Sequence, residues 1–115
     1  MSLAMTLRVL LVHAAGERRT LRYDDLATKA AIDPPHRIHR LTETLEALMA
    51  EDAAEGVPFL AALAISRARG GLPAPGFFAT ASRLGRYQGA ETGDQARAYH
   101  AEELARCFAH WGATG

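Results

Sequence analysis

Two adjacent prolines, Pro34 and Pro35, separate two stretches of helical periodicity, and this break constrains the fold more than any other feature of the chain. Proline lacks a backbone N–H and its ring clashes with the preceding helical turn, so one continuous helix cannot cover both stretches. We therefore expect a short helix within residues 24–31, a tight turn, and a longer helix from Pro34 to about residue 53.

The apolar side chains of each stretch fall on one helical face, as expected for helices that pack on a core. Asp24 is suited to cap the first helix, and Asp33 the second, with Pro34 in the first helical position. The inward positions are Leu26, Ala27, Ala30 and Ala31 in the first helix and Ile38, Leu41, Leu45, Leu48 and Met49 in the second.

The same patterns divide the rest of the chain. They predict a helix over 3–15, a short strand within 20–23, a buried segment over 57–66, a loop over 67–76, a strand or helix from Phe77, and a final helix over 94–111. The pattern of the 57–66 segment predicts a buried strand, although its alanines favour a helix. This order is typical of a winged helix-turn-helix. We predict one domain over 1–115, α+β and mostly helical, of winged helix-turn-helix type with an additional C-terminal helix.

Composition agrees with a small globular domain. The 115 residues are 49% apolar and 23% charged, with a formal net charge of zero. No apolar run approaches the roughly 18 residues that cross a bilayer, and the apolar start of the chain lacks the basic region of a signal peptide. We expect no membrane partner and a cytoplasmic location, which the single cysteine, Cys107, also suits.

Charge is unevenly distributed along the chain, and a local basic face is what a polyanionic partner needs. Residues 57–90 hold four arginines and no acid, whereas residues 41–56 hold five acids and no base. The second helix of a helix-turn-helix pair places its first residues in the DNA major groove. The candidates for contacts with bases and phosphates are therefore His36, Arg37, His39 and Arg40. The alternative is that this polar face is only hydrated.

The loop that follows the 57–66 segment has an unusual sequence, "RARGGLPAPGFF". Glycine-rich loops can cradle phosphate, but these two prolines donate no N–H, and the Lys-Ser/Thr pair of a P-loop is missing. We expect a wing between two strands, with Arg67 and Arg69 in contact with DNA phosphates. The alternative is a rigid turn whose prolines lower the entropy of the unfolded chain.

No catalytic residues, metal or cofactor are predicted. The five histidines form no HxxxH or HExxH pair; His36 and His39 lie three residues apart on one helical face, but a two-ligand site without a carboxylate is weak. Cys107 falls in an apolar stripe of the final helix and is expected to be a buried, inert thiol. We expect a protein that is not an enzyme.

The chain resembles the winged-helix domain of alkyltransferase-like proteins, in which "TLRYDDLATKA" would open the helix pair and "HRLTETL" would lie on the recognition helix. This resemblance places His39 where the family has its base-displacing arginine. The cysteine and His-Arg pair of the alkyl-transfer site have no counterpart, which excludes that reaction. "GVPFLAAL" and "GLPAPGFF" resemble more closely a group of small bacterial domains that also occur beside nuclease-like domains. That likeness implies a DNA-processing setting.

The final helix carries an apolar stripe with two interpretations. In the first interpretation, the stripe packs on the core of its own chain. In the second, the stripe joins two copies of the chain as a homodimer. The stripe consists of Tyr99, Leu104, Cys107, Phe108 and Trp111.

Together, the features of the whole sequence favour a non-catalytic domain that binds double-stranded DNA. The alternative is a protein-interaction or dimerisation module that does not bind DNA.

Overall fold

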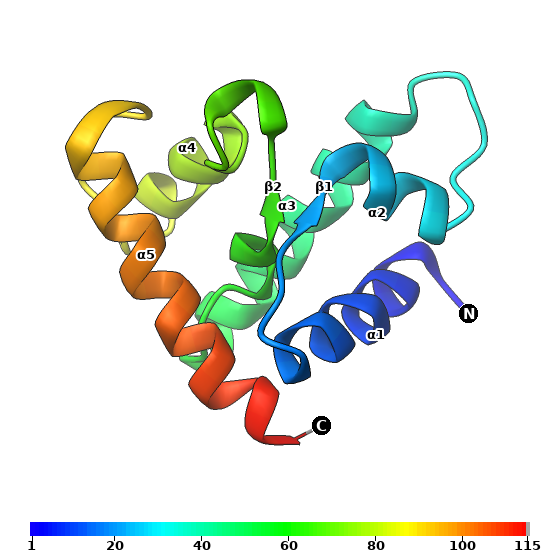
Figure 1. Ribbon diagram of the computed structural model, residues 1–115, viewed down its shortest axis with the longest axis horizontal. Helices are drawn as coiled ribbons and strands as arrows, with labels where there is room; N and C mark the ends of the chain where they lie inside the picture. Colours follow the sequence, from blue (N-terminus) through cyan, green and yellow to red (C-terminus); the bar gives the residue numbers. More distant parts are fainter. Residues whose placement is uncertain (115) are drawn as a thin grey trace.

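The computed structural model describes residues 1–114, and they form a mostly helical α+β structure (Figure 1). The α-helices are α1 (Leu3–Gly16), α2 (Tyr23–Lys29), α3 (Arg37–Glu55), α4 (Pro75–Arg83) and α5 (Gly93–His110). The strands are β1 (Leu21–Arg22) and β2 (Ala64–Ile65), and the short 3-10 helices are η1 (Leu60–Leu63), η2 (Arg67–Arg69) and η3 (Gly112–Thr114). None of the described helices is long and apolar enough to span a bilayer.

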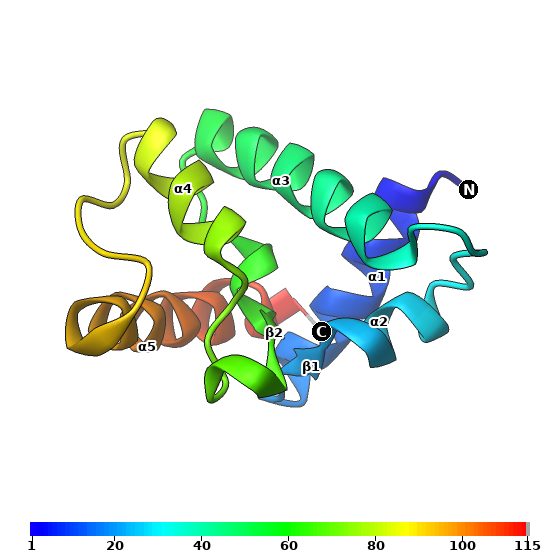
Figure 2. The same ribbon diagram turned by 90° about the horizontal axis from the view of Figure 1, so that it is seen from above.

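The segment that contains η1 lies at the centre of the molecule. Helices α1, α3 and α5 all pack on η1, and Figure 2 shows α3 and α5 on opposite sides of it. The four side chains of η1 are buried. The sheet is small: β1 and β2 pair in parallel, with Leu21 opposite Ala64 and Arg22 opposite Ile65.

The expected strand within 20–23 is confirmed, whereas the strand expected over 57–66 is only partly present. Within that segment, Leu60–Leu63 form η1 and the strand is limited to Ala64–Ile65. Two of the η1 residues are alanine, which has little preference for a strand and nothing to gain from pairing on a pleated surface.

The loop over 67–76 follows strand β2 but leads into helix α4 rather than into a second strand. The prediction of a wing between two strands is therefore wrong. After β2 the chain forms η2, returns through one antiparallel bridge between Ser66 and Leu72, and enters α4 at Pro75. Gly70 and Gly71 both have positive φ angles, 67° and 90°, which glycine adopts at little cost. No strand follows this turn within residues 1–114.

The start of α3 also differs from the expectation. The helix begins at Arg37 rather than at Pro34, and neither Asp33 nor any other side chain caps it. The reason is that Pro35 disfavours helical geometry in the residue before it, which is Pro34 itself. Asp24 likewise lies inside α2, which begins at Tyr23, and its carboxylate accepts a hydrogen bond from the neighbouring Asp25 N–H.

Most of the predicted core faces are buried. In α3 the side chains of Leu41, Leu45, Leu48 and Met49 are buried, but Ile38 in the first turn is 43% exposed. The stripe of α5 packs on the core of its own chain: Cys107 is buried, and Tyr99, Leu104, Phe108 and Trp111 are partly buried against the same cluster. This stripe therefore has a structural role within one chain.

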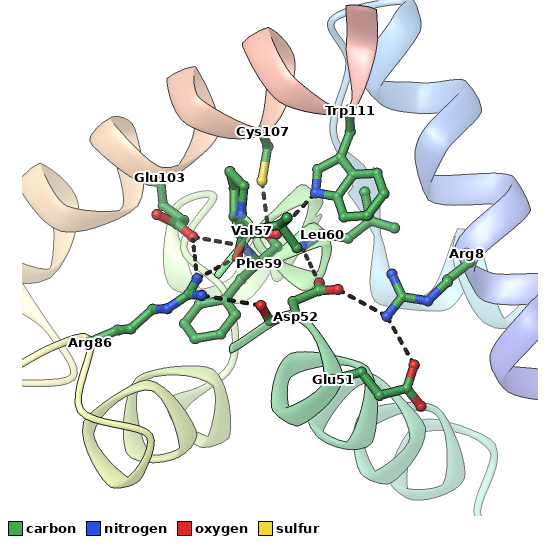
Figure 3. A network of polar contacts seen from close by, with 11 residues as sticks. Arg8, Glu51, Asp52, Val57, Phe59, Leu60, Arg86, Glu103, Cys107 and Trp111 are labelled. Atoms are coloured by element: carbon green, nitrogen blue, oxygen red, sulfur yellow. Dashed lines mark hydrogen bonds and ion pairs between the residues drawn. The ribbon is translucent and has the colours of Figure 1, made fainter. Parts of the chain in front are cut away.

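The central backbone of residues 57–60 obtains most of its hydrogen bonds from side chains rather than from a sheet (Figure 3). Two buried carboxylates accept from it: Asp52 Oδ2 from the Leu60 N–H at 3.1 Å and Glu103 Oε2 from the Phe59 N–H at 2.7 Å. Three side chains donate to its carbonyls: Arg86 to Val57 at 2.6 Å, Trp111 to Pro58 at 2.9 Å, and Cys107 to Phe59 at 2.8 Å. We call these five side chains the central clamp.

Each buried carboxylate of the central clamp has a cationic partner. Asp52 lies 2.9 Å from an Arg8 guanidinium nitrogen, and Glu103 lies 2.8 Å from Arg106 Nε. Burial raises the pKa of Asp52 above its ordinary value, although the Leu60 N–H and Arg8 oppose that effect. Such partners are required, because an unpaired buried charge is strongly destabilising.

Replacing Asp52 should therefore be costly. We expect Asp52→Ala to lower the free energy of unfolding by about 3 kcal/mol, because it leaves both the Leu60 N–H and Arg8 without their buried acceptor. Urea denaturation measures this. Glu51, the other and exposed partner of Arg8, is the matched control, and Glu51→Ala should cost about 0.5 kcal/mol or less. Equal losses for the two variants would contradict the assigned role.

Stability should also depend on the protonation of His100. This buried imidazole places Nε2 2.9 Å from the Ala62 carbonyl, and burial lowers its pKa despite the opposing effects of that hydrogen bond and of Glu103. The unfolded chain then binds the proton more tightly, so the free energy of unfolding should fall as pH drops below about 6.5 towards the lowered pKa of the folded state. Denaturation of His100→Gln should show a smaller slope in this window. The exposed His110→Gln should retain the original slope, and an unchanged slope in His100→Gln would refute this prediction.

Candidate nucleic-acid interface

The two arginines at the start of α3 are bonded to the turn that precedes the helix. Arg37 Nε donates to the Ile32 carbonyl at 3.0 Å, and its Nη2 donates to Thr28 Oγ1 at 3.0 Å. Arg40 Nη1 donates to the Asp33 carbonyl at 2.8 Å. These guanidinium groups thus stabilise the α2–α3 turn, a role that the sequence did not reveal.

The two histidines of the same turn are exposed. His39 Nε2 lies 2.8 Å from the carboxylate of Glu43, one helical turn later, so this imidazole already has an acidic partner. His36 precedes the helix with a positive φ of 60°, and its imidazole is exposed. Among the histidines and acids of residues 1–114, no three are grouped in a way that could hold a metal ion.

The two arginines of η2 differ from each other. Arg69 Nε donates to the Pro73 carbonyl at 2.8 Å and Nη2 donates to the Glu91 carbonyl, so this side chain fastens the turn to the loop before α5. Arg67 is exposed, and within the described chain its guanidinium group forms no hydrogen bond or ion pair. Of the two arginines of η2, Arg67 is therefore the one more available to a ligand.

A groove of about 400 Å³ brings η2 together with the starts of α2 and α3. Arg67 and Arg69 line it from one side, Ile38 and Thr42 from α3, and Arg22 from β1. In Figure 1, η2 and the start of α3 lie along the same upper edge of the molecule. Arg37 and Arg40 do not line this groove, so only two of the four arginines of the expected footprint, Arg67 and Arg69, share it.

The groove has an excess of positive charge and a fixed inner wall. Three arginines line it against one acid, Asp24, and one of the three, Arg22, also forms an ion pair with Asp25 at 3.4 Å. Tyr23 lines both this groove and a smaller hollow of about 110 Å³, and the Tyr23 hydroxyl accepts a hydrogen bond from the Ala74 N–H at 2.8 Å. Burial raises the pKa of Tyr23 to about 12, so the phenol stays neutral and adds no negative charge to the groove.

Sequence reasoning missed Arg22, Ile38 and Thr42 as parts of this surface. Ile38 was expected to be inward-facing, whereas Arg22 and Thr42 were not considered. The i, i+4 spacing of Ile38 and Thr42 on one side of α3 was the available signal. Pairing of β1 with β2 places Arg22 opposite Ile65, and that contact is not visible in a local pattern.

The buried thiol does not extend the chemistry of this surface. Cys107 is completely buried and donates to the Phe59 carbonyl, and burial raises its pKa well above its usual range. A protonated, inaccessible thiol is a poor nucleophile.

Comparisons with protein-family models, with curated proteins and with solved structures found no match for this chain. The candidate interface therefore rests on the residues of the groove alone.

The bonds of Arg37 predict a structural cost when that residue is replaced. We expect Arg37→Ala to lower the free energy of unfolding by about 1 to 2 kcal/mol, because two hydrogen bonds to the α2–α3 turn are lost. Arg67→Ala is the matched control in the same denaturation experiment, since this exposed arginine has no partner in the described chain and should cost less than about 0.5 kcal/mol. Similar stabilities for the two variants would contradict this assignment.

Proposed function

We propose that the protein is a non-catalytic DNA-binding domain whose contact surface is the groove between η2 and α3. The observation that carries the proposal is the position of Arg67, which is exposed, lacks an internal partner, and shares the groove with Arg22 and Arg69. Three lining arginines against one lining acid leave the groove with an excess of positive charge, and a local basic surface is what a polyanionic partner needs.

The contacts would be mainly to phosphates. Ile38 and Thr42 are the α3 side chains that line the groove, and an isoleucine cannot form the paired hydrogen bonds by which arginine reads guanine. Affinity would then be largely independent of sequence and would fall with salt. The histidines at the start of α3, His36 and His39, would extend this surface along the same edge.

We also infer that the proposed function uses a modified winged helix-turn-helix. Helices α1, α2 and α3 pack against one another as a three-helix unit, and α2 and α3 would be its helix-turn-helix pair. The compact η2 turn would take the position of the wing. Its single Ser66–Leu72 bridge makes it a shorter projection than a hairpin.

Removing the free cation of the groove tests this proposal. We expect Arg67→Ala to weaken binding to a mixed-sequence duplex, measured by fluorescence anisotropy, and to reduce the slope of log affinity against log salt by about 1, because one phosphate contact is lost. Arg83→Ala is the matched control, since Arg83 is an exposed arginine of the same acid-free segment that does not line the groove. Equal effects of the two variants, or no binding of the wild type at low salt, would overturn the proposal.

A second candidate function is self-association, and α1 is the surface that favours it. The stripe of α5 is packed within its own chain, but Met5 and Val9 of α1 are 53% and 55% exposed. Helix α1 is apolar on nearly all sides, a pattern usual for helices that are covered on all sides. A second copy of the chain would cover the exposed side.

Sedimentation velocity tests this second candidate. If α1 pairs two copies, the wild type should show a concentration-dependent increase in sedimentation coefficient that Val9→Asp removes, because a charge would enter the apolar contact. Ile38→Asp is the control, since Ile38 is also an exposed apolar residue but lies on another helix. A wild type that stays monomeric at high concentration would exclude self-association.

A further inference from the structure

The groove between η2 and α3 has an accessible apolar wall in addition to its arginines. Ile38, in the first turn of α3, is 43% exposed and lines the groove. Ile65 of β2 and the exposed Pro75 at the start of α4 line the same groove. Tyr23 lines it as well, and the hydrogen bond from the Ala74 N–H to the Tyr23 hydroxyl gives this ring a fixed position.

Cations lie directly beside this apolar wall. Arg67 follows Ile65 by two residues, is exposed, and has a guanidinium group without a hydrogen bond or ion pair in residues 1–114. Arg22 is the register partner of Ile65 in the parallel sheet. Its ion pair with Asp25 joins two largely exposed side chains, and such pairs are weak. The groove therefore offers apolar surface and free positive charge side by side.

The side of α3 that faces the groove is poorly suited to reading a double helix. Base pairs are read from the major groove by hydrogen bonds to the edges of the bases. Arg37 and Arg40 donate to the turn before α3 and do not line the groove. The α3 side chains that do line it are Ile38, which has no polar group, and Thr42, whose hydroxyl donates to the His39 carbonyl at 3.0 Å.

An unpaired strand offers what this surface can contact. In a duplex the flat faces of the bases are stacked on one another, whereas in a single strand they are open to apolar and aromatic side chains. Proteins that bind single strands without sequence preference combine a basic groove with such side chains. The volume of about 400 Å³ is in the range of pockets that enclose a small ligand, which suits one nucleotide and not a double helix.

We propose that the groove binds single-stranded DNA in preference to duplex DNA. This inference rests on the proposed function, and it names the form of DNA that the same surface takes. One base would lie against Ile38, Ile65 and Pro75, and the neighbouring phosphate would pair with Arg67. The base contact would add affinity that does not depend on salt to the phosphate contact, which does.

Fluorescence anisotropy with two labelled probes tests the preference. One probe is an oligothymidylate, which forms no self-paired structure, and the other is a mixed-sequence duplex of the same length. We expect the full chain to bind the single strand about tenfold more tightly at equal salt, because only the unpaired base reaches the apolar wall. Equal or weaker binding of the single strand, with the duplex still bound, would overturn this inference and leave the proposed function standing. Binding of neither probe would overturn both.

Ile38→Ala tests the apolar wall itself. This exposed side chain can be shortened without disturbing the core, and we expect the variant to bind the single strand about fivefold more weakly while its affinity for the duplex is unchanged. Arg67→Ala, in contrast, should weaken binding of both probes because both present phosphates. Val9→Ala is the matched control, since Val9 is an exposed apolar residue outside the groove and the change keeps α1 apolar. An Ile38→Ala variant that loses affinity equally for both probes, or for neither, would overturn the inference.

Discussion

The hydrogen bonding of the central backbone is the constraint on which the rest of the structure depends. Residues 57–60 cross the interior outside any sheet, so their N–H and C=O groups need partners from elsewhere. The central clamp supplies most of them from α3, α5 and the segments that follow α4 and α5, and the Val57 N–H donates to the Asp52 carbonyl. Arg8 and Arg106 then neutralise the two buried carboxylates, which connects α1 to the same network.

The groove and a second hollow are both positioned by this central segment. It continues through η1 into β2, and β2 fixes the start of η2, which carries Arg67 to the edge of the groove. On its other side the same segment places Val57 and Pro58 beside α5, where Arg86, Glu103 and Arg106 line a second hollow. The two surfaces therefore share one support but are lined by different arginines.

Helical periodicity was a good guide to the helices and a poor one to the connections. The predicted helices over 3–15 and 94–111 correspond closely to α1 and α5, because long amphipathic patterns leave few alternatives. The start of α3 and the turn after β2 were misplaced, since they depend on geometry at Pro34 and on one cross-chain bridge. The burial of Asp52 and Glu103 could not be predicted, because a sequence does not show which backbone N–H groups will lack a partner. For the same reason Arg37 and Arg40 were assigned to DNA, although the turn before α3 uses their donors.

Native-state hydrogen exchange at Phe59 and Leu60 tests the central claim most directly. If Glu103 and Asp52 hold these two amides as described, both N–H groups should exchange only through global unfolding. Their exchange free energies should then equal the free energy of unfolding from denaturation. Exchange of both amides through a low-energy local opening, at a free energy similar to that of the exposed loop amide of Gly89, would show that the central clamp does not hold the fold together.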